Sequence, residues 1–218
     1  MRLILILIVY FSICSFIGKG IELSYYALRR EWKKLRDSGF LHGPFSPIYG
    51  FGALAIYFYS VYSVNFPLGI NLIVYFIIPT GIEYVGSHLL EKVFDIRLWN
   101  YSKYNFNVNG RICLGISIIW FLFALLFVFL IQPFLFGVLD KIPFNFILIW
   151  TVVFLVYFGI DFSFSVKKYL HQKKMRKIFK VQDYNLSNLL KRGKNMAKKK
   201  AKATKKKPTK KTTKKKKK

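Results

Sequence analysis

The stretch Ile112–Gln132, ICLGISIIWFLFALLFVFLIQ, contains 21 residues and no charged side chain. A helix needs about 20 mostly apolar residues to cross the hydrocarbon core of a bilayer. Inside lipid, every backbone N–H and C=O group must also be paired within the segment, which favours a helix over other conformations. This stretch therefore predicts a transmembrane helix and indicates the class of the whole protein.

Four further apolar stretches have a comparable length and composition, and they lie at 3–21, 47–64, 68–86 and 143–166. Pro47 and Pro143 stand where two of these stretches begin, at a first helical position where the missing N–H of proline costs nothing. The sequence thus predicts an all-α fold, namely a polytopic membrane helix bundle with five transmembrane helices.

Charge divides the chain into a nearly balanced part and a strongly basic part. Residues 1–166 carry a net charge of +4, whereas residues 167–218 hold 24 Lys or Arg and a single acid, Asp183. We predict a five-span domain over 1–166, a cytoplasmic amphipathic segment over 167–192 and a disordered lysine-rich tail over 193–218.

The positive charges also predict an orientation. Five Lys or Arg residues lie between 23 and 42 and four lie between 87 and 111, whereas the other two gaps hold only Lys141. The positive-inside rule places the two basic gaps and the basic tail in the cytoplasm. With five spans, the N-terminus is then expected outside.

Several ionisable groups lie at or near membrane depth, where charge is costly and side chains face the bundle interior or water. Glu83, Ser87 and Glu91 recur every four residues, so they share one helix face. One interpretation is a polar pocket open to the cytoplasm that binds a ligand or couples to protons. In the other, each acid reaches the interface or pairs with an arginine to hold helices together. The candidate pocket residues are Glu22, Arg30, Glu83, Ser87, Glu91, Arg111 and Asp161.

Two cytoplasmic loops stand out by composition. Residues 39–53 hold four glycines and two prolines that shape the backbone, and residues 99–111 are dense in aromatic and amide groups. We predict that they form a docking face for a partner or cap the pocket, with an ordinary interfacial belt as the alternative. The candidate docking residues are Gly43, Pro44, Pro47, Tyr49, Gly50, Trp99, Tyr101, Asn105, Asn107 and Gly110.

Sequence patterns for catalysis and metal binding are missing. The chain has no phosphate-binding Gly-x-x-x-x-Gly-Lys-Ser/Thr loop, no His-Glu-x-x-His and no Gly-x-Ser-x-Gly. Cys14 and Cys113 lie in apolar stretches and are predicted to be small buried residues. We therefore expect no catalytic, metal or cofactor site, and an ATPase activity would have to come from another chain.

Four groups of residues carry a resemblance to a known family. They are Glu22 with Tyr26, GFLHGPFSPIYGFGA (39–53), EYVGSHLLEKVF (83–94) and WNYSKYNFNVNGRICL (99–114). Together they resemble the CmpB-like bacterial family of ABC-transporter type IV permeases, over about residues 1–130. Position 100 is Asn where members usually carry Asp. The resemblance implies a transporter permease of the bacterial cytoplasmic membrane that works with a separate ATPase.

Three functions stay open on the sequence. The first is a permease-like subunit that forms an oligomer or joins an ATPase. The second is a membrane scaffold whose basic tail binds anionic lipid or, without sequence specificity, nucleic acid. The third is a membrane-embedded enzyme that acts on lipid headgroups through Glu83, Glu91 and Arg111.

Overall fold

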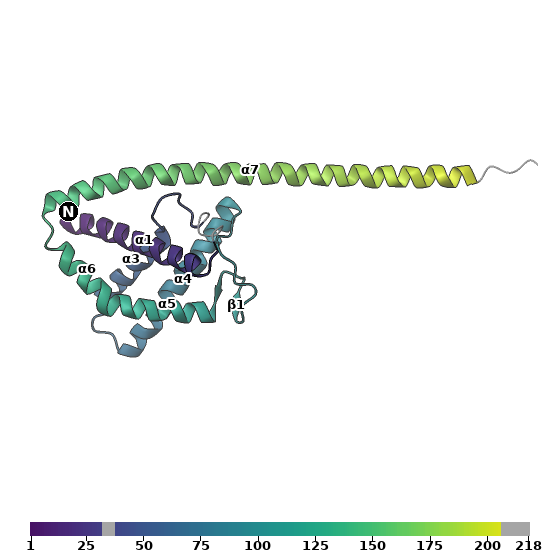
Figure 1. The fold of residues 1–218 in the computed structure, drawn as a ribbon. Coiled ribbons are helices and arrows are strands. Elements are labelled where there is room, and N and C mark those ends of the chain that lie inside the picture. The colour runs from purple at the N-terminus through teal and green to yellow at the C-terminus, as the bar shows by residue number, and fades with distance from the viewer. Residues whose placement is uncertain (32–37, 206–218) are drawn as a thin grey trace, which may run out of the picture. The chain divides into compact units, whose positions relative to one another are not determined.

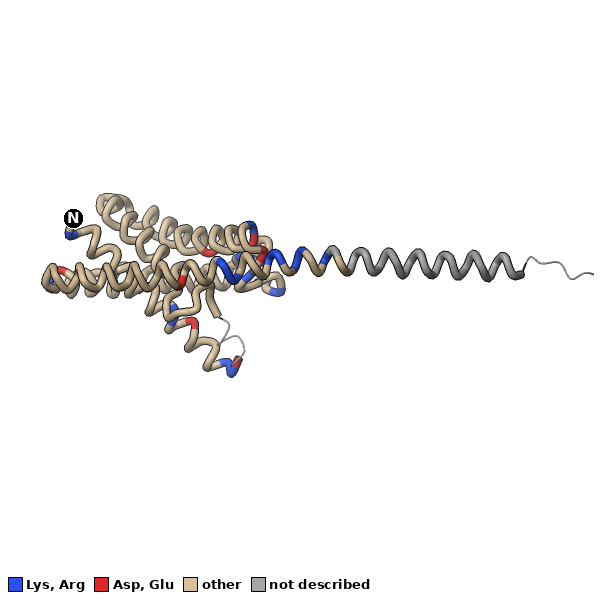
Figure 2. Tube along the Cα trace, turned by 90° about the horizontal axis from the view of Figure 1, so that it is seen from above, with Lys and Arg blue, Asp and Glu red and all other residues tan. Residues whose placement is uncertain are grey.

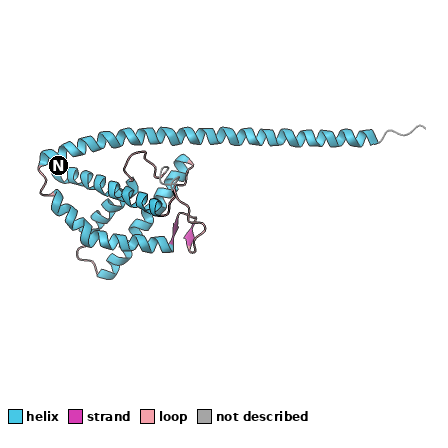
Figure 3. Ribbon diagram, in the orientation of Figure 1, coloured by secondary structure: helices cyan, strands magenta, loops and turns pink. Residues whose placement is uncertain are grey.

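The computed structural model of the chain describes residues 1–31 and 38–205, which form two units, Met1–Leu170 and His171–Lys218. Helices make up most of the first unit, and its only described strands form one short hairpin (Figures 1 and 3). The predicted all-α fold class is therefore confirmed.

The helices follow the predicted apolar stretches. They are α1 (Arg2–Leu28), α3 (Pro47–Tyr62), α4 (Leu68–Phe94), α5 (Leu114–Leu126) with the π-helical turn η1 (Phe127–Ile131) and α6 (Gln132–Leu139), and α7 (Phe144–Lys205). The segments α5, η1 and α6 form one continuous helix over Leu114–Leu139. Most of these helices run several residues beyond the apolar stretch, because charged and polar residues can continue a helix once it has left the hydrocarbon.

The number of predicted spans needs a correction. Four helices of the described chain are long and apolar enough to cross a membrane: Arg2–Leu28, Leu68–Phe94, Leu114–Leu139 and the Phe144–Lys180 part of α7. The predicted span 47–64 is instead the 16-residue helix α3. At 1.5 Å per residue it measures about 24 Å, less than the roughly 30 Å of a hydrocarbon core. The predicted count of five full-length transmembrane helices is therefore wrong.

The helical segments of the first unit nevertheless run alternately between two ends. At one end, called the Arg2 end, Nη2 of Arg2 donates to the carbonyls of Asp140 at 2.7 Å and Ile142 at 3.1 Å. At the other, called the His42 end, the ring of Phe40 lies 5.1 Å from the rings of both Phe94 and Tyr169. This aromatic cluster joins the loop after α1 to the last turn of α4 and to α7.

The core of the first unit lies where α1 packs against α3. Tyr10 is fully buried there, and its ring contacts Tyr57 and Phe136 at centroid distances of 6.1 and 5.0 Å. Gly50 allows the close approach, because a Cβ atom on it would overlap Ser15 and lie 2.6 Å from the ring of Phe11.

Local signals explain where α3 and α4 begin and end. Pro47 occupies the first turn of α3, and Ser46 before it has an extended backbone. Asp95 ends α4 in a left-handed conformation with φ 58°, a common way to close a helix. The loop that follows α4 forms a two-stranded antiparallel hairpin, in which Asn107–Val108 (β1) pairs with Ile112–Cys113 (β2). Both cysteines are free and buried, as predicted.

The second unit continues α7. The backbone of this helix is described as far as Lys205, so it includes the predicted segment 167–192 and the first part of the predicted tail. Lys and Ala are good helix formers, which explains why helix extends past Gly193. Residues 206–218 of the predicted tail lie outside the described residues.

Candidate functional site

The carboxyl group of Glu83 is the most enclosed acid among the predicted site residues. Its side chain points into the bundle from α4 and only 6% of the residue is exposed. Oε1 accepts a hydrogen bond of 2.9 Å from the hydroxyl of Tyr101, whereas Oε2 is buried without a hydrogen-bond partner. Ser87, one turn further along α4, is also buried. A buried carboxyl oxygen without a partner is unusual and needs a physical explanation.

Aromatic side chains from three other segments surround this acid. Trp120 of α5 lies beside Glu83, and its indole N–H is buried without a partner that meets hydrogen-bond geometry. The ring of Trp120 packs edge-on against Tyr49 of α3, with 5.5 Å between centroids. Tyr49 is close enough to interact electrostatically with both Glu83 and Glu22 of α1. We call Glu22, Tyr49, Glu83, Tyr101 and Trp120 the Glu83 cluster.

Tyr101 reaches this cluster from the loop between α4 and α5. Burial raises the pKa of its hydroxyl far above the usual value, and the nearby charge of Glu83 and the hydrogen bond to it act in the same direction. The hydroxyl therefore keeps its proton and acts as a donor to Glu83 under all ordinary conditions.

A second cluster lies one to two turns further along α4. Glu91 Oε1 accepts hydrogen bonds from Nε and Nη2 of Arg97 at 2.9 and 2.7 Å, and Oε2 accepts one from Nη2 of Arg111 at 2.6 Å. The guanidinium of Arg111 also lies over the ring of Tyr84, 5.5 Å from its centroid. This arrangement fits the structural interpretation, in which an acid and arginines hold the loop to the helix.

Asp161 of α7 belongs to a third cluster, away from Glu83. Only 8% of the residue is exposed, and its carboxylate accepts hydrogen bonds from the backbone N–H groups of His42 at 3.0 Å and Gly43 at 2.8 Å. Nδ1 of His42 lies 2.9 Å from the hydroxyl of Ser165, and Nε2 lies 3.2 Å from the amine of Lys168. The predicted pocket residues thus lie in three clusters, and Arg30 is exposed after the end of α1.

The predicted docking residues of the second loop mostly brace its hairpin. The indole of Trp99 donates to the carbonyl of Arg111 at 2.9 Å, and Asn107 accepts a hydrogen bond of 3.0 Å from the N–H of Gly110. Gly110 has φ 69°, and a Cβ atom on it would lie 2.6 Å from Oδ1 of Asn100. Asn105 is exposed at the turn. The residues most open to a partner are its neighbours Tyr104, Phe106 and Val108, which are 51%, 81% and 49% exposed.

The predicted docking residues of the first loop have different positions. Gly43 touches α7, since a Cβ atom on it would overlap the hydroxyl of Tyr157, whereas Pro44 is exposed. Pro47 and Gly50 lie in α3, and Gly50 is buried against α1. This loop is therefore packed onto the bundle over much of its length.

The sequence reasoning missed some polar residues that the structure brings together. Lys19 is buried in α1, and its amine donates to the carbonyl and the hydroxyl of Ser38 at 2.6 and 2.7 Å. A lysine between two glycines in an apolar span was a usable signal. The positions of His42 and Trp120 beside the acids had no such signal, because they depend on how the loop and α5 pack.

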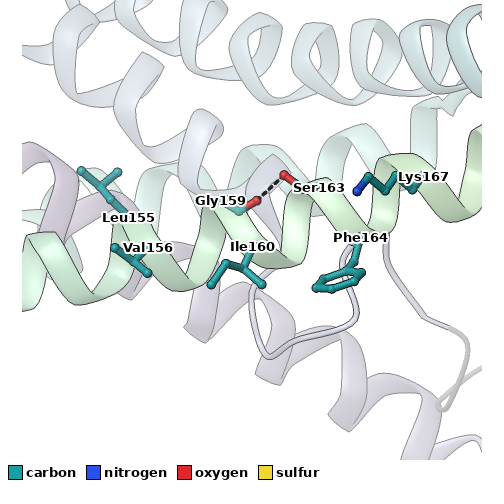
Figure 4. Close-up of a pocket in the computed structure, with 7 residues that line it drawn as sticks. All are labelled: Leu155, Val156, Gly159, Ile160, Ser163, Phe164 and Lys167. Carbon is teal, nitrogen blue, oxygen red and sulfur yellow. Dashed lines mark hydrogen bonds between the residues drawn. The ribbon is translucent and has the colours of Figure 1, made fainter.

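A groove of about 380 Å³ lies along one face of α7, and none of the predicted site residues lines it. Figure 4 shows its seven lining residues on successive turns of that helix, with the hydroxyl of Ser163 donating to the carbonyl of Gly159 at 2.7 Å. Its lining comes from a single helix and is mostly apolar, as expected of a face in contact with lipid.

Comparisons with known proteins agree with the membrane class. A family model described as "Putative ABC-transporter type IV" matches residues 9–166, which includes the hairpin and all members of the three clusters except Lys168. No curated protein and no solved structure matches the chain.

Proposed function

The chain belongs to the "Putative ABC-transporter type IV" family, and from this membership we propose that it is a permease-like membrane subunit that works with a separate ATPase. Helices long and apolar enough to span a membrane support this role. The sequence contains no phosphate-binding loop, so hydrolysis of ATP by the assembly would be the work of a second protein.

The distribution of charge supports a cytoplasmic His42 end. Figure 2 shows Lys and Arg along the part of α7 that follows its apolar stretch. Lys168 of α7 contacts His42 at this end, and Arg97, which follows α4, donates to the carbonyl of Asn109. The Arg2 end has few basic residues, and Arg2 itself is bonded to backbone carbonyls. The five helical segments α1, α3, α4, α5–α6 and α7 run alternately between the two ends, so the positive-inside rule then favours a bacterial cytoplasmic membrane protein with its C-terminus inside and its N-terminus outside.

The exposed tip of the hairpin is the observation that carries the proposal of a partner. Phe106 is 81% exposed although it is a large apolar residue, and its backbone has φ 52°, which a bulky residue rarely adopts. The N–H of Leu114, at the start of α5, donates to the carbonyl of Phe106 at 3.3 Å. The tip is thus held by backbone bonds and presents an aromatic side chain, as surfaces for protein partners often do.

The alternative of an enzyme acting on headgroups receives less support. Glu91 and Arg111, which were to act on the substrate, are bonded to each other at 2.6 Å. Such a pair serves to hold the loop against α4. Both carboxylate oxygens of Glu91 already accept hydrogen bonds from Arg97 or Arg111, which leaves neither of them free for a substrate.

Purification of the full chain from its own membranes in mild detergent tests the proposal. We expect ATP hydrolysis to co-purify with the natural protein and with Tyr62→Ser, a control in which a 76% exposed aromatic residue of α3 is changed. Phe106→Ser should lose most of that hydrolysis while the yield of the chain is unchanged. Equal hydrolysis in all three preparations, or none in any of them, would contradict the proposal. A reporter fused after Lys218 tests the orientation, which requires activity on the cytoplasmic side.

A further inference from the structure

We propose that the carboxyl group of Glu83 is a proton-binding site, and that the bound proton controls how tightly Tyr101 holds the loop between α4 and α5. This inference does not depend on an ATPase partner, since it concerns an equilibrium within the chain itself. It explains why an acid with a free oxygen is buried in a helix long enough to span a membrane.

The carboxyl group of Glu83 lacks a counterion among the described residues. In the described part of the chain, no Lys, Arg or His nitrogen lies within 4.0 Å of the Glu83 carboxyl group. Glu91, by contrast, has two arginines, and Asp161 has His42 at 3.5 Å in addition to two backbone N–H groups. A buried carboxylate without a partner of opposite charge becomes neutral by taking up a proton or binds a cation.

Two groups that can donate a hydrogen bond face the carboxyl group of Glu83. Tyr101 donates to Oε1, and Trp120, which can only donate, lies beside the carboxyl group from α5. These two donors favour the charged form, whereas burial favours the neutral form. Because these effects oppose each other, the carboxyl group of Glu83 can change its protonation state. Oε2, which has no hydrogen-bond partner, is the oxygen that would take up the proton.

Among the residues that the structure describes, the other titratable groups near the cluster do not supply a positive charge to Glu83. Tyr49 of α3 lies between Glu83 and Glu22, and Tyr26 of α1 and Cys113 of β2 lie at its edges. The amine of Lys19 on α1 is bonded to Ser38. A proton is therefore the smallest ligand that makes the site neutral without a rearrangement of the surrounding helices.

Tyr101 connects the carboxyl group of Glu83 to the surface of the protein. A hydrogen bond to a charged carboxylate is about twice as strong as one to a neutral group, so uptake of a proton weakens the bond from Tyr101. The N–H of Tyr101 donates to the carbonyl of Gly110 at 2.7 Å, and its ring packs edge-on against Tyr104 at 5.9 Å. A change at Glu83 is thereby passed to the hairpin that presents Phe106.

The test is a pH titration of the full chain in detergent or lipid, followed by tryptophan fluorescence and by the infrared band of protonated carboxyl groups. We expect a fluorescence step that Trp120→Phe removes, together with a carboxyl band that follows the same step. Glu83→Gln should remove both. Tyr101→Phe removes a donor that favours the charged form, so its step should move to higher pH by about one unit or more.

Tyr104→Phe is the matched control, because Tyr101 and not this exposed tyrosine of the same loop donates to Glu83, and its step should not move. The proposal is overturned if the step persists in Glu83→Gln or fails to move upward in Tyr101→Phe. If Glu83→Gln does not fold, the Tyr101→Phe shift and the carboxyl band of the natural protein decide. A step whose midpoint changes between sodium, potassium and choline buffers would show that the site binds a cation instead, which also overturns it.

Discussion

The backbone N–H of Gly43 lies 2.8 Å from Oδ2 of Asp161, although 118 residues separate the two in sequence. The contact requires glycine, because a Cβ atom at position 43 would lie 2.8 Å from the same oxygen. The neighbouring N–H of His42 donates to Oδ1 at 3.0 Å. One carboxylate on α7 thus holds two successive N–H groups of the loop between α1 and α3.

Replacing Asp161 with Asn should loosen this loop. The amide keeps one acceptor oxygen but turns an NH₂ group toward one of the two N–H donors. Since hydrogen bonds to charged groups contribute about 1.5–3 kcal/mol each, we expect a loss of about 2 kcal/mol in stability. Hydrogen exchange at His42 and Gly43 should become faster, whereas Asp140→Asn, at an exposed position, should leave it unchanged. Unchanged hydrogen exchange in both variants would show that Asp161 does not hold the loop through these two hydrogen bonds.

The contact between α1 and α3 should tolerate no side chain at position 50. Gly50→Ala places a methyl group against Ser15 and Phe11, and overpacking of this kind costs about 1–3 kcal/mol. Gly52→Ala is the matched control, because a Cβ atom there meets nothing within 4 Å. Thermal unfolding in detergent should show a lower midpoint for Gly50→Ala and an equal or higher one for Gly52→Ala. The reverse order would mean that the two helices pack through another face.

The hairpin should distinguish two adjacent positions that both have positive φ. Gly110→Ala adds a strained backbone at φ 69° and a contact with Asn100, so we expect it to open the turn. Asn109→Gly at φ 54° introduces a residue that adopts this conformation freely but loses the 3.4 Å hydrogen bond from Nδ2 to the hydroxyl of Tyr84, so its effect should be much smaller. Limited proteolysis within 99–113 measures both effects. Equal cleavage of the two variants would count against the described turn.

The ion pair between Glu91 and Arg111 should stabilise the protein by holding the loop between α4 and α5 against α4. Arg111→Gln removes the donor that bonds Oε2 of Glu91 at 2.6 Å, so it should lower the melting temperature and expose the loop to protease. Lys103→Gln changes an exposed cation of the same loop and should alter neither. If Arg111→Gln melts like the natural protein, the pair has no structural role.

The sequence was sufficient for the class of fold and for the family. Uncharged apolar runs such as 112–132 predicted where helices form, and the quoted loop motifs identified the family that the matched range 9–166 confirms. The prediction of five full spans failed at α3, because hydropathy over 47–64 does not reveal that the helix ends at Tyr62. The length of α3 is decided by the turn that follows it, in which the N–H of Phe66 donates to the carbonyl of Ser63 at 2.9 Å.

Hydropathy and the order of charges are properties of neighbouring residues along the chain, so the sequence by itself determined the helices, the basic C-terminal part and the presence of acids at membrane depth. The partner of each acid was decided only by tertiary structure. Glu83 bonds to Tyr101, Glu91 to Arg111 and Asp161 to Gly43, at sequence separations of 18, 20 and 118 residues. The rotation of each helix about its axis and the path of each loop select these partners, and both follow from side-chain packing between segments.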